Sequence, residues 1–241
     1  LALTFQYSNS DTSAVNPATK QFFNYVRQSE EDQLMSGGQF TNFLTRSIIP
    51  TYTYNTVNSG FQPTAGQSFS GTFEFTGGPF GGNVNFFRPT LEWQFFKSMN
   101  YLKPDRFGRN VLAMRIQTSH IKGFSSTSVP FFERFFAGGD FDIRGFEFRS
   151  ISPIAFVERE LTDPFTGQPA VVDDLAWVGG DTSAVFNIEY RIPLVGPLTL
   201  APFLDIGNSW VTNKDQLKRQ TVDADDKISY QPVKFFTFFF I

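Results

Sequence analysis

The chain has 241 residues, with 32 Phe, 19 Gly, 14 Pro and no Cys, and a formal net charge of −3. The absence of cysteine excludes a disulfide framework and a thiolate metal site, and a mildly acidic chain lacks the basic surface that nucleic-acid binding requires. The length fits one large β domain or two smaller units.

A transmembrane helix is excluded as well, because the sequence has no run of about 18 apolar residues. A membrane-spanning β-barrel is compatible with the composition. Its strands need only about ten residues each with every second residue apolar, which gives a middling mean hydropathy. The value for this chain is −0.18. Leu1 opens directly into a strand pattern without a signal peptide, so we expect a mature or truncated piece.

Alternation of apolar and polar residues predicts strands along most of the chain. In the first, Leu3, Phe5 and Tyr7 alternate with Thr4 and Gln6. The clearest strands, in chain order, cover residues 1–8, 43–55, 68–76, 87–97, 112–119, 183–192 and 200–209. A compact turn with Pro and Gly at its pivots follows the second of these, and its key residues are Phe61, Pro63, Thr64 and Gly66. The pattern therefore predicts an all-β antiparallel fold.

Residues 129–149, VPFFERFFAGGDFDIRGFEFR, fit neither a helix nor a strand period. Seven Phe surround the pair Gly138-Gly139, and such a segment would aggregate in water unless a larger structure enclosed it. It belongs to a stretch without strong periodicity, residues 123–182, that is too long for a routine connection. We therefore expect a long loop folded into the interior. The next connection, residues 193–197, is tight, and long loops alternating with short turns are typical of outer-membrane barrels.

Strand parity separates charged from apolar residues. Alternation alone cannot distinguish a membrane barrel from a soluble one, whose apolar face points inward. The polar faces, however, carry charges of both signs and prefer Arg to Lys, as suits a hydrated lumen, while the apolar faces are rich in aromatics, as suits lipid. The charged residues on the polar faces are Glu74, Arg88, Glu92, Arg115, Glu189, Arg191 and Asp205.

The string PFFERFFAGGDFDIRGF, with Gly138, Gly139 and Asp140 before the IRGF step, resembles the signature loop of the outer-membrane insertase and transporter superfamily that includes BamA, TamA and the two-partner-secretion pores. The F-x-P-T-x-G turn at residues 61–66 is similar to a periplasmic turn of that family. The resemblance implies a 16-stranded transmembrane barrel with the loop in its lumen. Residues 1–241 would then be the C-terminal part of the barrel, without the first strands and the periplasmic POTRA domains, and residues 123–182 would be an extracellular loop.

The resemblance also implies a lock between loop and barrel wall. Arg144, followed by Gly145 and Phe146, would reach acids on the lumen wall, namely Glu189 and the Asp205 of an F-x-D-x-G strand that also contains Phe203 and Gly207. Parity places both acids on the polar face independently. A guanidinium can bridge two carboxylates, and glycine allows close backbone approach. The alternative is that Arg144 is a solvated loop residue.

The function implied by the resemblance is assembly of outer-membrane proteins, in which barrels insert through a seam between the first and last strands. Residues 235–241, FFTFFFI, would form the seam strand through Phe236, Phe238 and Phe240, although the chain ends in Ile rather than Phe. We expect no enzymatic chemistry, no cofactor and no metal. The expected partners are outer-membrane lipids, unfolded barrel proteins and accessory assembly lipoproteins. The alternatives are a TamA-like or two-partner-secretion translocator and, from another class, a passive porin-type channel.

Overall fold

The computed structural model describes residues 1–13, 35–36, 39–99, 110–125, 129–162, 169–195, 197–213, 218–222, 228–232 and 235–236. These residues form antiparallel strands and two short 3₁₀ helices, which confirms the all-β prediction. Among them, no helix is long and apolar enough to cross a membrane.

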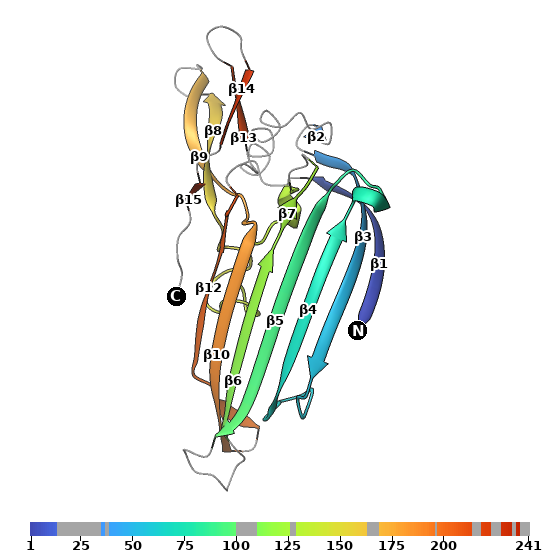
Figure 1. Ribbon diagram of the computed structural model, residues 1–241. Coiled ribbons are helices and arrows are strands. Elements are labelled where there is room, and N and C mark those ends of the chain that lie inside the picture. The colour runs from blue at the N-terminus through green and yellow to red at the C-terminus, as the bar shows by residue number, and fades with distance from the viewer. Residues whose placement is uncertain are drawn as a thin grey trace.

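One curved sheet dominates the molecule (Figure 1). Its long strands pair antiparallel with their neighbours in the order β1 (Ala2–Ser13), β3 (Gln39–Asn55), β4 (Gly66–Thr76), β5 (Phe86–Met99), β6 (Asn110–His120), β10 (Thr182–Val195) and β12 (Phe203–Trp210). Short strands extend it, namely β2 (Met35–Ser36), β7 (Lys122–Gly123) and β11 (Leu198–Leu200). Within the described residues the sheet stays open, with β1 and β12 at its two edges.

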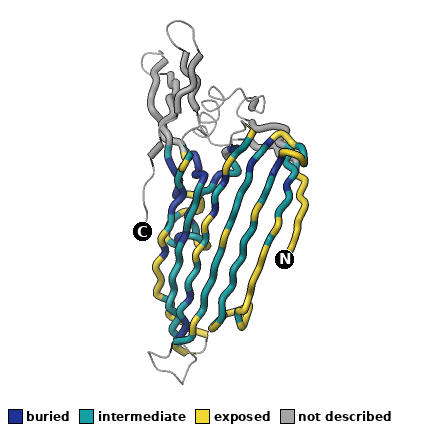
Figure 2. The backbone as a smooth tube through the Cα atoms, viewed as in Figure 1, coloured by how far each residue is buried: buried dark blue, intermediate teal, exposed yellow. Residues whose placement is uncertain are grey.

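The strand register gives the sheet two chemically different faces, because directly paired residues point to the same side. One row across four strands is apolar and joins Trp93, Ile116, Phe186 and Ile206. The adjacent row, on the opposite face, joins Gln94, Arg115, Asn187 and Asp205. We call this second side the polar face. Most buried residues gather toward the upper end of the sheet and beside the loop that crosses it (Figure 2).

The predicted turn between residues 56 and 65 connects β3 to β4 at the lower end of the sheet in Figure 1. The side chain of Asn58 organises it, because its amide oxygen accepts hydrogen bonds from the backbone N–H groups of Thr64 (3.1 Å) and Ala65 (3.2 Å). At Gly66 φ is +105°, and a Cβ would lie 2.3 Å from the carbonyl oxygen of Thr56. Glycine is therefore required there, while Phe61 at the tip is 81% exposed.

The connection between β6 and β10 contains more regular structure than the sequence suggested. After the 3₁₀ helix η2 (Phe131–Glu133) and an irregular segment comes a hairpin of β8 (Ile154–Thr162) and β9 (Pro169–Trp177). The long loop expected over residues 123–182 thus contains this hairpin. Apolar and charged residues fall on both parities of its two strands, so the sequence shows no alternation there.

Outside the main sheet, β13 (Lys218–Val222) pairs with β14 (Ile228–Pro232), and β15 (Phe235–Phe236) pairs with β8. Phe236 is therefore joined to the hairpin, where it pairs with Ile154. Phe238 and Phe240 lie outside the described residues, and the seam role of residues 235–241 stays a prediction.

Candidate functional site

The irregular segment of the long connection, which we call the inward loop (residues 129–153), lies against the sheet beside β10 and β12 (Figure 1). Two short backbone bridges hold its ends. Phe135 pairs with Gly180, and Ala137 pairs with Ile151 through two N–H to O=C bonds of 2.9 Å each. Residues 138–150 thus form a closed excursion, the loop tip.

The paired glycines begin the loop tip because the backbone there is left-handed. Gly138 and Gly139 have φ of +104° and +111°, and a Cβ on Gly138 would lie 2.6 Å from the carbonyl oxygen of Glu147. Side-chain residues rarely adopt this conformation. Gly145 also has a positive φ, +87°, but a Cβ there would meet open space. The predicted close approach at Gly145 was therefore wrong, and its requirement is conformational.

An apolar cluster fixes the underside of the loop tip to the polar face. Ile143, which is 1% exposed, packs with Ala137, Ile151 and Val185 of β10, and Phe146 lies against this group. The close approach predicted for Gly145 occurs instead at Gly207 of β12, where a Cβ would lie 3.0 Å from the Cδ1 atom of Ile143. Burial of these side chains sets the depth and direction of the segment that carries Arg144.

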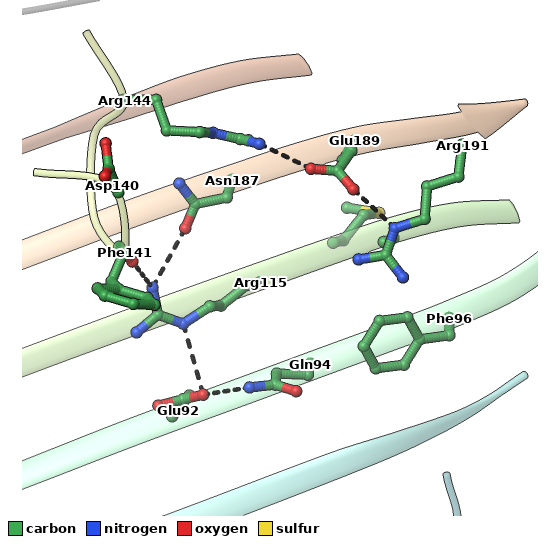
Figure 3. Close-up of a pocket in the computed structure, with 12 residues that line it drawn as sticks. Glu92, Gln94, Phe96, Arg115, Asp140, Phe141, Arg144, Asn187, Glu189 and Arg191 are labelled. Carbon is green, nitrogen blue, oxygen red and sulfur yellow. Dashed lines mark hydrogen bonds and ion pairs between the residues drawn. The ribbon is translucent and has the colours of Figure 1, made fainter. Parts of the chain in front are cut away.

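Arg144 bridges the two acids of neighbouring strands. Its Nε donates to Asp205 Oδ2 at 2.7 Å and one terminal nitrogen donates to Asp205 Oδ1 at 2.8 Å, while the other donates to Glu189 Oε2 at 2.7 Å. The backbone N–H of Arg144 adds a bond of 3.0 Å to Asp205 Oδ2. Figure 3 shows Arg144 reaching from the loop to Glu189, which also accepts from Arg191 at 2.6 Å. We call this arrangement the Arg144 clamp.

Burial makes the clamp electrostatically uneven. The side chain of Asp205 is 2% exposed, whereas those of Arg144 and Glu189 are 27% and 21% exposed. The Arg144 guanidinium also lies over the ring of Phe203, 3.6 Å from its centroid, which adds a cation–π contact. Hydrogen bonding to Asp205 raises the pKa of Arg144 above its ordinary value, so this residue stays charged.

Two wall residues that were not predicted as site residues, Arg115 and Asn187, hold the backbone of the loop tip. Arg115 donates to the carbonyl oxygen of Phe141 at 2.7 Å, and Asn187 Nδ2 donates to that of Asp142 at 2.6 Å and to Asp205 Oδ1 at 2.9 Å. Figure 3 shows Arg115 beneath the loop. Both residues lie in the same cross-strand row as Asp205. The only sign of this in the sequence is that each residue falls on the polar parity of its strand.

A cavity of about 420 Å³ opens beside the clamp between the loop tip and the wall, and Asp140 and Phe141 line it from the loop side. On the wall side of the cavity Arg115 pairs with Glu92 at 3.4 Å, and Arg191 pairs with Glu189 at 2.6 Å. Burial raises the pKa of Asp142, in the loop tip, against the opposing attraction of Arg115. The arrangement is suited to holding a loop in place.

The structure brings together the predicted residues of both the loop and the F-x-D-x-G strand. Arg144 of the loop tip contacts Glu189, Asp205 and Phe203. Gly207 closely approaches Ile143 of the same tip. The predicted turn at residues 61–66 lies away from the clamp, at the lower end of the sheet. It is a separate feature of the fold.

The chain is similar to known proteins in sequence and in fold. Residues 1–231 match the model of the Omp85 superfamily domain. The chain is 34% identical over 176 residues to the outer membrane protein assembly factor BamA of Nitratidesulfovibrio vulgaris, a match that covers 70% of this chain and 19% of that protein. The fold resembles the crystal structure of Haemophilus ducreyi BamA lacking POTRA domains 1–3, with a TM-score of 0.64 at 20% identity over 89% of this chain and 39% of that one.

The chain thus spans about a fifth of the length of the curated relative that it matches. Its antiparallel sheet, with an apolar and a polar face, is part of an outer-membrane β-barrel. From the family match over nearly its whole length, we conclude that the chain belongs to the Omp85 superfamily.

Proposed function

We propose that the protein containing this chain inserts and folds β-barrel proteins into the bacterial outer membrane. The named function of the relative from Nitratidesulfovibrio vulgaris supports this assignment. The observation that carries it within the chain is the Arg144 clamp, which ties the inward loop to β10 and β12. In this proposal residues 1–241 are a partial barrel domain, residues 123–182 are an extracellular loop, and POTRA domains stand upstream.

In this proposal an incoming strand pairs with an exposed strand edge at the seam of the barrel, which residues 235–241 would form. Within the described residues β12 pairs along its length with β10. An exposed edge presents unpaired N–H and C=O groups, and these recruit another strand by β-augmentation. Because Asp205 belongs to β12, the clamp fixes this strand relative to the loop. Assembly by this route needs no covalent chemistry, cofactor or metal.

The proposed partners follow from the two surfaces. The apolar face contacts outer-membrane lipids, and the seam contacts unfolded barrel proteins. Accessory assembly lipoproteins complete the proposed machinery, as the resemblance of the IRGF loop to its family implies.

A reconstitution experiment tests the proposed function. The full-length protein is placed in liposomes, and the folding of a urea-denatured outer-membrane barrel is followed by its heat-modifiable mobility on gels. We expect the wild type to accelerate folding over empty liposomes, Arg144→Ala to reduce the acceleration at least tenfold, and the exposed-site control Glu147→Ala to retain it. A wild type that gives no acceleration but conducts ions steadily in planar bilayers would contradict the assignment and favour a passive channel.

A further inference from the structure

A second set of charged residues ties the inward loop to the sheet far from Arg144. Glu133, in η2 at the start of the loop, accepts a hydrogen bond of 2.8 Å from the guanidinium of Arg88 on β5. The contact joins residues 45 positions apart in the chain. The three charged side chains involved, those of Glu74, Arg88 and Glu133, are partly buried.

Hydrogen bonds within the sheet hold the wall side of this contact in place. Arg88 Nε donates to Glu74 Oε2 at 2.9 Å, and the other oxygen of Glu74 accepts bonds of 3.1 Å from the hydroxyls of Ser47 and Thr76. Because Glu74 occupies one edge of the planar guanidinium, the remaining terminal nitrogen of Arg88 points to Glu133. The three adjacent strands β3, β4 and β5 therefore present a single oriented donor to the loop.

We propose that Glu133 is a positioning residue that anchors the entry limb of the loop, residues 129–136, independently of the Arg144 clamp. The two anchors use different strands, β4 and β5 in one case and β10 and β12 in the other, and opposite charges. At the entry limb a loop acid meets a wall base, and at the tip a loop base meets wall acids. A loop that has lost Arg144 thus keeps its entry limb docked. This inference concerns loop position and does not depend on the proposed assembly function.

The effect of losing Glu133 is moderate, because a cavity of about 90 Å³ lined by polar groups, among them Gln6 and Ser8, lies beside the ion pair. A hydrogen bond between charged groups in such a setting changes an equilibrium by about tenfold. Glu133→Ala removes the loop partner and leaves the sheet residues unchanged, which makes it the preferred variant.

Hydrogen–deuterium exchange on the full-length protein in detergent or liposomes tests the proposal. We expect Glu133→Ala to speed exchange of residues 129–136 about tenfold while leaving residues 138–151 within about twofold of wild type. Arg144→Ala should show the reverse pattern, and Glu147→Ala, on the same loop, should change neither segment. Unchanged exchange of residues 129–136 in Glu133→Ala, in both wild-type and Arg144→Ala backgrounds, would overturn the inference.

A double-variant comparison separates this specific pair from a general loosening of the loop. Arg88→Gln should expose residues 129–136 as Glu133→Ala does, and the combined variant should exchange no faster than either alone, because one contact has been removed twice. Combined with Arg144→Ala, by contrast, Glu133→Ala should produce additive effects. Additive effects for Arg88→Gln and Glu133→Ala, in a protein whose heat-modifiable mobility shows that the barrel is folded, would refute the pairing.

Discussion

Replacing Arg144 by Ala is the most direct perturbation of the site. The change removes the guanidinium that holds both oxygens of Asp205 and one oxygen of Glu189. Removing one partner from a buried ion pair costs about 3–5 kcal/mol. Water can replace part of the contact at Glu189, which is 21% exposed, but little of it at Asp205, which is 2% exposed. We therefore take the lower end, about 3 kcal/mol, which corresponds to about 150-fold in the ratio of docked to undocked loop.

Exchange of the amides in the loop tip measures this ratio. The N–H of Ile151 is bonded to the carbonyl oxygen of Ala137 at 2.9 Å, and that bridge opens when the tip undocks. We expect exchange over residues 138–151 to accelerate by about 150-fold in Arg144→Ala. Arg144→Lys should resemble the alanine variant more than the wild type, because an ammonium cannot bridge two carboxylates with a planar fork.

Glu147→Ala controls for loss of a charge on the same loop, since Glu147 is exposed. The reasoning would be refuted by an Arg144→Ala protein whose barrel is folded, as judged by heat-modifiable mobility, and whose loop-tip exchange stays within threefold of wild type. Such a result would mean that the apolar cluster around Ile143 holds the tip without the clamp.

Three further predictions concern neighbouring residues. Asp205→Asn should accelerate loop-tip exchange more than Glu189→Gln, because Asp205 is more buried and also accepts from Asn187; equal effects would argue against the uneven burial of the clamp. Gly207→Ala should destabilise the barrel by about 1–3 kcal/mol, since its Cβ would lie 2.8 Å from the carbonyl oxygen of Ala184, and the temperature at which the folded gel form disappears should fall. Burial raises the pKa of Asp142, so its ionised form opposes docking at neutral pH, and Asp142→Asn should slow loop-tip exchange there after correction for intrinsic rates. That difference should shrink as pH falls through the raised pKa, where the wild-type carboxyl becomes neutral; a pH-independent difference would contradict the assignment.

The sequence alone determined the sheet and the faces of its strands. Side chains alternate strictly along a strand, so the parity of residues 183–192 and 200–209 is enough to place Glu189 and Asp205 on the same polar side, and the strand register agrees. The resemblance of the IRGF loop then supplied the partner, Arg144, which the structure places against both acids.

Tertiary structure decided what depends on register and on the path of the loop. Arg115 and Asn187 hold the loop backbone because strand pairing sets them in one row with Asp205. The alternation within one strand does not reveal which residues of its neighbours lie beside it. The hairpin of β8 and β9 was not predicted, because apolar and charged residues do not alternate along the sequence of either strand. Glu133 contacts Arg88, which is 45 positions away in the chain. Sequence patterns did not reveal this pair, because its formation depends on the path of all the backbone between the two residues.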